Sequence, residues 1–564
     1  MPTLRRRPPG DPERLPASLP AVLRRVLAAR GVRADELALD LAHLLPPSGL
    51  ANIDAAATLL AEAIRAGEPV VIAGDYDADG ATGTALAVLG LRALGAAAVH
   101  YVVPDRFRMG YGLSPALAEQ AAATGARVLV TVDNGISSVS GVASARALGL
   151  RVLITDHHLV GAELPAAEVI VNPNLPGCGF ASKSLAGVGV MFYVLLALRA
   201  RLRADGWFDA ARREPNLSEF LDLVAVGTVA DVVRLDRNNR ILVEQGLRRM
   251  RAGRMRPGLA ALLQVAGRDP ARLTAQDLGF VLGPRLNAAG RLDDIRTGIE
   301  CLLTDDTEHA LALARQLDAF NRNRREIEAQ MHDDALERLA GDDAIGVCLY
   351  SDDWHEGVVG IVAGRLKERL HRPVIAFARA RQADLLKGSG RSIPGLHLRD
   401  ALAAIDARAP GLIERFGGHA MAAGLSLRAD ALDAFSEHFD ALCREWLDEA
   451  ALAQCLDTDG ELAADEMTLD TARALEAAGP WGQGFPEPVF ETIARVIEAR
   501  PVGGDGAHVK YRLAHPAGVL SAIDFNGAER LCDRGEVHLA FTLSINRWQG
   551  RESLDLRILA LTPL

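Results

Sequence analysis

Three aspartates occupy alternate positions directly after a short apolar run. The run reads VVIA at 70–73, and Asp75, Asp77 and Asp79 follow it. Carboxylates this close in sequence repel one another, so the loop that carries them is strained unless cations neutralise it. Hard divalent ions such as Mg²⁺ and Mn²⁺ favour oxygen ligands. The stretch therefore predicts a divalent-cation site, and the alternative interpretation is an acidic loop in solvent.

Two further polar clusters also begin where an apolar run ends. The run at 128–132 ends at Asp133, and the run at 152–155 ends at Asp156, His157 and His158. Such runs alternate with helical stretches over residues 50–175, which predicts a mostly parallel, doubly wound α/β sheet. Ligands bind at the carboxyl edge of such sheets. We therefore expect these polar clusters to converge in space although they are far apart in sequence.

A further acidic candidate, Asp231, lies in the apolar stretch GTVADVV at 227–233. An unpaired carboxylate among apolar residues costs free energy. A metal ion or a basic group would satisfy it. A hydrogen bond to backbone at a helix end would do so equally well, so the local sequence leaves both interpretations open.

The composition is that of a large folded protein. The 564 residues are 49% hydrophobic and 24% charged, which predicts roughly three or four domains with substantial cores. The net charge of −11 argues against a generic basic nucleic-acid coat protein. It still allows an enzyme that grips nucleic acid in one local groove, where metal ions and a few arginines supply the positive field.

The cysteines and the hydropathy bear on the compartment. The six cysteines are scattered and form no CxxC pair, which predicts reduced thiols of a cytoplasmic protein. The first residues contain arginines but no apolar core of a signal peptide. The most apolar helix candidate, 188–198, is too short to cross a bilayer. We therefore expect a cytoplasmic protein without a membrane partner.

The character of the chain changes along its length, which predicts several domains. The expected regions are an N-terminal extension at 1–49, a catalytic α/β domain at 50–300, a connecting helix at 301–342, a second α/β domain at 343–455 and a small β-barrel at 456–564. Within the second domain, LKGSGRS at 386–392 is expected to be a small-residue loop that admits a phosphate.

These motifs, in this order, resemble the DHH phosphoesterase superfamily. The segments GDYDADG at 74–80, VDNG at 132–135, TDHH at 155–158 and GTVADVV at 227–233 fit its four metal-site motifs. GPRLNAAGR at 283–291, the stretch at 353–363 and the stretch at 416–424 resemble the RecJ family of single-strand-specific 5′→3′ exonucleases and its DHHA1 half. The similarity covers most of residues 50–490. It implies a DHH catalytic domain, a DHHA1 domain and, by position, a C-terminal OB-fold.

The resemblance implies a two-metal mechanism for hydrolysing the phosphodiesters of single-stranded DNA, with Mn²⁺ or Mg²⁺ ions about 3.5–4 Å apart. The implied metal ligands are Asp77, Asp79, Asp133, His157 and Asp231. Asp133 is expected to bridge the ions, and Asp75 is either a further ligand or an outer hydrogen-bond acceptor. His158 is expected to face the scissile phosphate or its leaving group, and Asp156 to orient the histidine pair.

The resemblance also implies a set of substrate contacts. The candidates are Arg106, Arg108, Arg285, Asn287, Arg291, Ser389, Arg391 and His419. The arginines of GPRLNAAGR are expected to contact phosphate, while Ser389 with Arg391 is a candidate pair for a 5′-terminal phosphate. Two positions depart from the family pattern: Met109 stands where an acid is expected, and Phe485 where Asn is common.

The implied setting is DNA repair and recombination, with single-stranded DNA as substrate and a single-strand-binding protein and a helicase of the RecQ type as candidate partners. Two alternatives stay open. One is a DHH-family phosphodiesterase for short oligonucleotides or cyclic dinucleotides. The other is a catalytically dead relative that serves as a scaffold, although every expected ligand position is occupied here.

Overall fold

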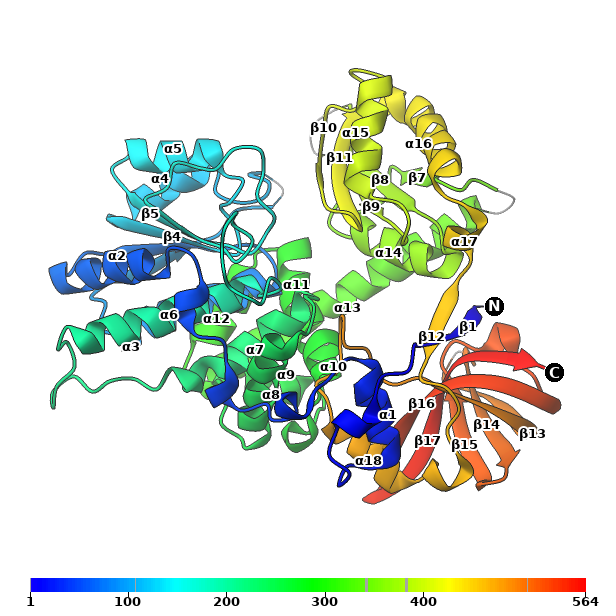
Figure 1. The fold of residues 1–564 in the computed structure, drawn as a ribbon. Coiled ribbons are helices and arrows are strands. Elements are labelled where there is room, and N and C mark those ends of the chain that lie inside the picture. Colours follow the sequence, from blue (N-terminus) through cyan, green and yellow to red (C-terminus); the bar gives the residue numbers. More distant parts are fainter. Residues whose placement is uncertain (1, 107, 340–342, 381–383, 505) are drawn as a thin grey trace. The chain divides into compact units, whose positions relative to one another are not determined.

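The computed structural model describes residues 2–564 except 107, 340–342, 381–383 and 505. The chain forms two compact units. The larger unit consists of residues 7–321 and 459–564, and the smaller consists of residues 322–458 with the N-terminal strand β1, Thr3–Arg6. Helix α13, Thr307–Arg338, runs from the larger unit into the smaller (Figure 1).

A five-stranded parallel sheet organises the first part of the larger unit. Its strands are β2 Val70–Ala73, β3 Val99–Val102, β4 Val128–Val132, β5 Arg151–Thr155 and β6 Val169–Val171. They lie in the order β3-β2-β4-β5-β6, and all neighbouring pairs are parallel. Strands buried on both faces read as continuous apolar runs, which is why the sequence revealed β2, β4 and β5.

Helices cover both faces of this sheet (Figure 1). The alternating side chains of β2 divide between the two cores: Val71 and Ala73 face α4 and α5, while Val70 and Ile72 face the core that includes α2, α3 and α6. The helices are α2 Ile53–Ala66, α3 Ala78–Ala93, α4 Pro115–Ala123, α5 Val139–Ala147 and α6 Gly187–Ala204. The expected doubly wound α/β arrangement is therefore confirmed.

A helical layer follows the sheet and leads to the long helix. Its members are α7 Leu221–Ala230, α8 Arg237–Arg251, α9 Pro257–Val265, α10 Ala275–Asp277, the π-helical turn η7 Leu278–Leu282, α11 Gly283–Leu292 and α12 Arg296–Leu303. The sequence suggested one connecting helix over 301–342, which is wrong at its start. Asp306 accepts hydrogen bonds from the amides of Glu308 and His309 and so begins a separate helix, α13. Residues 340–342 of that prediction lie outside the described part of the chain.

The smaller unit holds a mixed sheet in the order β10-β11-β9-β8-β7. Its strands and helices are β7 Val347–Ser351, α14 Val359–Leu370, β8 Val374–Arg379, β9 Leu385–Arg391, α15 Leu398–Arg408, β10 Arg415–Gly418, β11 Ala422–Arg428, α16 Leu432–Trp446 and α17 Glu449–Leu452. The expected loop at 386–392 is wrong, because β9 pairs with β8 and β11 on its two edges. The glycines of β9 allow close packing, since a Cβ on Gly388 would lie 2.4 Å from the ring of Phe377.

The N-terminus also contributes a strand that the sequence did not reveal. Strand β1 pairs in parallel with β12, Cys455–Thr458, within the smaller unit. The remaining N-terminal helix, α1 Ala21–Ala29, and helix α18, Leu469–Ala477, belong to the larger unit. Short 3₁₀ turns lie at Pro12–Arg14, Ala34–Glu36, Leu41–His43, Pro47–Gly49, Leu217–Phe220, Pro270–Arg272, Ala429–Ala431, Ala464–Glu466 and Ala528–Arg530.

The C-terminal strands close into a barrel. They are β13 Phe490–Val502, β14 His508–His515, β15 Gly518–Asp524, β16 Gly535–Trp548 and β17 Arg551–Pro563, in the order β13-β14-β15-β17-β16. Pairing of β13 with β16 completes the closure. Phe485 at the entry to the barrel is buried, and the guanidinium of Arg240 lies 3.8 Å from its ring centroid, so this departure from the family pattern makes a packing contact.

No helix among the described residues is long and apolar enough to cross a membrane.

Candidate metal centre and active site

The acidic loop after β2 is held in place by backbone amides. Asp77 caps helix α3, since its Oδ1 accepts a hydrogen bond from Gly80 N at 2.9 Å. Asp79 stands in the first turn of α3, and its two carboxylate oxygens accept from Gly187 N at 2.6 Å and Val188 N at 2.9 Å. These two amides are at the start of α6, where helix N-termini favour negative charge. The loop is therefore built to hold carboxylates at fixed positions.

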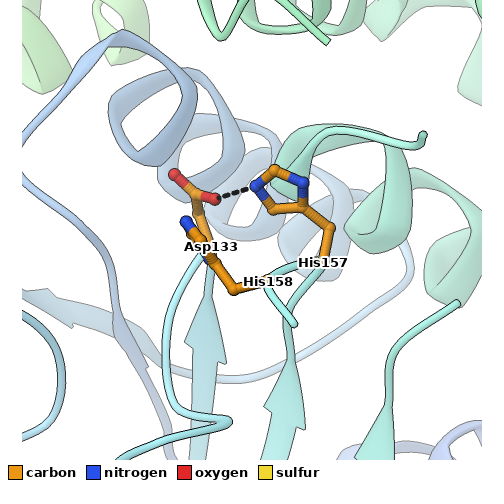
Figure 2. Close-up of side chains that lie close together, drawn as sticks. All are labelled: Asp133, His157 and His158. Carbon is orange, nitrogen blue, oxygen red and sulfur yellow. Dashed lines mark ion pairs between the residues drawn. The ribbon is translucent and has the colours of Figure 1, made fainter. Parts of the chain in front are cut away.

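The second carboxylate position, Asp133, directly follows β4. Its backbone has φ of +64°, a left-handed conformation that is uncommon for residues other than glycine and that Asp tolerates better than most. The neighbouring strand β5 brings His157 opposite it, and His157 Nε2 lies 3.0 Å from Asp133 Oδ1 (Figure 2). His157 Nε2 also lies 3.4 Å from Asp231 Oδ2. One imidazole thus stands between two carboxylates from distant parts of the chain.

Asp231 is at the C-terminal end of α7. Its amide donates to Gly227 O at 3.0 Å, so the backbone completes the helix while the carboxylate is left to face His157. The sequence left open whether a backbone hydrogen bond satisfies this acid. Among the described residues, Asp231 Oδ2 has no hydrogen-bond partner, and it lies 3.4 Å from His157 Nε2.

The structure brings the predicted ligands into one cluster, which we call the carboxylate cage. Three sets of side chains offer ligand atoms that lie within 4.8 Å of one another in each set. The sets are Asp75 with Asp77 and Asp133, Asp79 with His157 and Asp231, and Asp133 with His157 and His158. Asp133 and His157 each belong to two sets, so the three sets form one connected site.

Burial and mutual repulsion raise the pKa of the cage carboxylates. The pKa of Asp75, Asp133 and Asp231 lies well above the usual range, because burial penalises the charged form and neighbouring carboxylates add to that effect. Burial and Asp77 raise the pKa of Asp79 to about 7, against the opposing amides of α6. The cage can therefore be fully ionised only when positive charge compensates it.

Asp156 behaves differently from the cage carboxylates. Burial alone would raise its pKa, but the hydrogen bond from the His158 side chain and the amide of Ile136 outweigh burial and hold the pKa below the usual range. The same contact holds the pKa of His158 above its usual value in spite of burial. His158 Nδ1 lies 2.7 Å from Asp156 Oδ1, and the amides of His157 and His158 also donate to that carboxylate. Asp156 thus anchors the histidine pair.

The donor set of the cage fits divalent cations. Asp75 Oδ1, Asp133 Oδ1 and Asp231 Oδ2 are buried, and none has a hydrogen-bond partner within the described residues. Buried carboxylate oxygens in that state are costly unless a cation compensates them. Oxygen ligands with one or two imidazoles suit Mn²⁺ and Mg²⁺, and none of the cage residues is a cysteine.

Helix α11 lies across the acidic loop. Asn287 Oδ1 accepts a hydrogen bond from Ala78 N at 2.8 Å, and a Cβ on Gly290 would lie 1.9 Å from Tyr76 O. Only glycine permits this approach. Arg285 on the same helix pairs with Asp318 and donates to Val281 O, so its described contacts are intramolecular. The phosphate contacts of Arg285 and Arg291 stay predictions.

The loop after β3 carries the first pair of predicted substrate arginines. The guanidinium of Arg106 lies 4.9 Å from the ring centroid of Tyr76, within the acidic loop. Arg108 is exposed and lies 3.7 Å from Asp105. Arg106 is therefore placed beside the cage, whereas Arg108 points to solvent. Met109, which follows Arg108 in the sequence, packs on the core under α4 and α5.

Tyr111 is a residue of the site that the sequence reasoning missed. Its hydroxyl lies 3.0 Å from Asp133 O and 3.0 Å from His158 Nδ1. Its ring meets the rings of Tyr76 and His158 edge to face. The signal available in the sequence was the Gly110-Tyr111-Gly112 loop, in which both glycines have positive φ. That signal indicated a turn, but not which strand end the turn would reach.

The other predicted substrate residues belong to the smaller unit. Ser389 and Arg391 lie on β9, and Arg391 Nη1 donates to Ser389 Oγ at 3.1 Å. A Cβ on Gly360, in the first turn of α14, would lie 2.7 Å from Ser389 Oγ. His419 lies between β10 and β11, where its amide donates to Ala422 O. Ser389 and Arg391 thus meet a helix N-terminus, which favours anions.

The fold and the cage define a DHH-type phosphoesterase. Three family models match the chain: the DHH family N-terminal domain at 69–228, the DHHA1 domain at 343–445 and the RecJ OB domain at 458–560. The single-stranded-DNA-specific exonuclease RecJ of Dickeya dadantii is 54% identical, and the alignment covers 100% of this chain and 99% of that protein. The chain belongs to the RecJ family.

Two crystal structures of RecJ from Thermus thermophilus are similar to this chain along most of its length. The complex with Mn²⁺ has a TM-score of 0.78 at 32% identity and covers 98% of this chain and 80% of that one. The complex with Mg²⁺ has a TM-score of 0.73 at 31% identity and covers 97% of this chain and 78% of that one. Those relatives hold the two ions for which the donor set of the cage is suited.

Proposed function

We propose that this chain is a metal-dependent exonuclease that hydrolyses single-stranded DNA in the 5′→3′ direction. One observation carries the proposal. Carboxylates from three separated segments meet the imidazole of His157, which comes from a fourth, at one sheet edge, in sets whose ligand atoms lie within 4.8 Å. Membership of the RecJ family and similarity to relatives with bound Mn²⁺ or Mg²⁺ support the substrate class and the cofactor.

The cage residues would hold two divalent ions. Asp77, Asp79, Asp133, His157 and Asp231 are the proposed ligands, and Asp133, which belongs to two of the three sets, is the proposed bridge. Asp75 shares a set with Asp77 and Asp133, which supports its role as a further ligand. When bound, such a pair of ions neutralises the phosphate, activates a water and stabilises the leaving oxygen.

His158 and Asp156 are proposed to act on the reacting phosphate as a pair. The Nδ1–H of His158 donates to Asp156 Oδ1, and Nε2 is the atom proposed to meet the substrate. An N–H at that position stabilises negative charge on the phosphate or donates a proton to the leaving oxygen. Asp156 keeps the imidazole in this orientation and stabilises its cationic form.

The other predicted contacts complete the proposal. We propose that Arg106 beside Tyr76 and Asn287 on α11 position the strand. In the smaller unit, we propose that Ser389 and Arg391 on β9, which face the start of α14, bind a terminal phosphate. Arg108, Arg285, Arg291 and His419 are proposed as further contacts. The same proposal includes the domain boundaries given above and a cytoplasmic location. It also includes a role in DNA repair and recombination, and association with a single-strand-binding protein or a RecQ-type helicase. Free cysteines support the location.

Digestion of end-labelled DNA tests the function. The full chain should degrade 5′-phosphorylated single strands with Mn²⁺ or Mg²⁺, leave duplex DNA intact and become inactive with chelator. Loss of supporting residues around a metal ligand costs about 10–100-fold, so Asp133→Ala should lower the rate at least about 100-fold while strand binding persists. Asp269→Asn, at an exposed cap of a surface turn, is the matched control. Faster hydrolysis of a dinucleotide than of a long strand would favour the small-substrate alternative, and undiminished hydrolysis by Asp133→Ala would refute the bridge.

A further inference from the structure

Three large apolar side chains stand exposed on segments that carry residues of the carboxylate cage or pack against them. Val232 follows Asp231 and is 65% exposed, and Leu159 follows His158 and is 64% exposed. Phe280, on the π-helical turn η7, is 75% exposed. Single exposed apolar residues are ordinary, but two of these directly follow cage residues in sequence and the third lies on a turn that packs against the helix ending at Asp231, so we group them as an apolar rim. The rim is defined here as Leu159, Val232 and Phe280.

The position of Phe280 relative to the cage follows from close packing of its neighbours. A Cβ on Gly279 would lie 3.3 Å from Val229 Cγ1, and a Cβ on Gly283 would lie 3.1 Å from Ala230 Cβ. Val229 and Ala230 are the two residues that precede Asp231, so η7 lies directly against the end of α7. Phe280 stands in this turn with its ring in solvent. π-Helical turns are rare and occur frequently at functional sites.

Val232 carries a second, independent sign of function. Its φ of +60° is a left-handed conformation in which a β-branched residue is a genuine outlier. Strain of this kind persists only where the surrounding structure imposes it, and it clusters at ligand sites. The strained residue lies immediately after a proposed metal ligand and keeps an apolar side chain in solvent instead of burying it.

We propose that Phe280 is the platform on which an unpaired nucleobase of the substrate strand stacks, and that Val232 contributes to the same apolar rim. The inference rests on the proposed function, since it takes the phosphodiester to be bound at the cage. In this proposal, a strand whose phosphate lies among the carboxylates places its next bases at the rim. Every base has a π-face, whatever its identity, and an aromatic side chain stacks on that face without distinguishing one base from another.

The platform bears on strand specificity. A base inside a duplex has both faces covered by its neighbours in the stack, so it cannot lie on Phe280 without being unpaired and unstacked first. An unpaired base at the end of a single strand has a free face. Phe280 thus favours the single strand at the point where the chain enters the cage, and it does so without sequence preference.

A double-mutant cycle tests the contact by removing the Phe280 side chain, the base that it contacts, or both. Wild type, Phe280→Ala and Phe280→Tyr are assayed on single strands that are intact or carry one abasic site, placed in turn at each of the first nucleotides from the attacked end. Stacking is worth enough that Phe280→Ala should raise KM about ten-fold on the intact strand. Phe280→Tyr should retain the wild-type KM. On the strand that lacks the contacted base, wild type and Phe280→Ala should have the same KM.

The matched control is Leu148→Ala, which removes a half-exposed apolar side chain at the end of α5 in the same unit. Equal KM of wild type and Phe280→Ala on the intact strand would overturn the proposal. A loss of equal size on the intact strand and on every abasic strand would also overturn it, because the side chain would then act without a base.

Binding in chelator separates this inference from the proposed function. A strand carrying 2-aminopurine near the attacked end should lose fluorescence on binding wild type, and should keep more of it on binding Phe280→Ala. If wild type hydrolysed no strand but showed this difference, the nuclease proposal would fail and the platform would stand. If it hydrolysed single strands and showed no difference, the platform would fail alone.

Discussion

The hydrogen bonds of each carboxylate separate the roles of neighbouring acids at the site. Asp156 is fully buried and accepts from three backbone amides and the imidazole of His158, so its oxygens are already occupied. Asp133 Oδ1 and Asp231 Oδ2 are equally removed from water but are free of hydrogen bonds among the described residues. A carboxylate whose oxygens are already hydrogen-bonded, such as Asp156, orients other groups. A buried carboxylate oxygen without a hydrogen bond, as in Asp133 and Asp231, is suited to bind a cation.

This distinction predicts different effects for the two kinds of acid. Asp156→Asn keeps the shape but removes the charge that orients His158, so kcat should fall about 10–100-fold while KM changes little. Mn²⁺ affinity, measured by titration calorimetry, should change far less than it does in Asp133→Asn. Steady-state kinetics with Asp269→Asn as control measures the first effect. A kcat equal to wild type would show that Asp156 does not act through His158.

At the scale of elements, helix α11 fixes the geometry of the acidic loop. It lies against the loop by the hydrogen bond from Ala78 N to Asn287 and by the direct contact of Gly290 with Tyr76 O. The other end of the same helical segment, η7, packs on α7 next to Asp231. One continuous segment therefore touches two of the chain segments that supply the cage.

Gly290→Ala tests this arrangement. The added methyl would lie 1.9 Å from a backbone oxygen, so the helix or the acidic loop must shift. Displacing a supporting group of a metal site typically costs about 10–100-fold in affinity, and we expect a loss of that size for Mn²⁺. The control is Gly298→Ala on α12, where the new methyl would meet Leu286 at an ordinary contact of 3.4 Å. Equal Mn²⁺ affinity of the two variants, measured by titration calorimetry, would refute the role of α11.

These elements also show how far the sequence could predict the structure. The acids and histidines after β2, β4 and β5 were predictable, because apolar strand runs and the edge rule for parallel sheets place them together. Strand β9 was not, because its glycines looked like turn residues and only the contact of Gly388 with Phe377 explains them. Tyr111 was not, because its hydroxyl reaches His158 across a loop whose path depends on tertiary packing.

At the scale of the larger unit, the N-terminal extension and the barrel entry are joined to the catalytic part by buried polar contacts. Arg30, at the end of α1, pairs with Asp459 at 2.6 Å, and both side chains are almost fully buried. The guanidinium also donates to Pro486 O and lies 5.4 Å from the ring centroid of Trp481. Trp481 in turn stacks on Phe485, the ring beneath Arg240. The segment at 481–486 is thus a packed joint of the unit.

The joint makes a prediction about stability. Asp459→Ala leaves the guanidinium of Arg30 buried without its counter-charge, which typically costs about 3–5 kcal/mol. Amides over residues 480–489 should then exchange hydrogen for deuterium about 100-fold faster or more, as mass spectrometry would measure. The control Glu552→Gln breaks the exposed pair with Arg473, and exposed pairs contribute at most about 1 kcal/mol.

A double variant separates the charge from the packing. Replacing both partners, in Arg30→Met with Asp459→Leu, removes the uncompensated charge and should restore much of the protection, because buried ion pairs are often replaceable by apolar residues. If Asp459→Ala alone left exchange unchanged, the ion pair would not hold the joint. If the double variant exchanged faster than Asp459→Ala, the hydrogen bonds of Arg30 to the backbone, and not the relief of its charge, would dominate. The first result would leave the stacked rings of Trp481 and Phe485 as the stabilising contact of the joint.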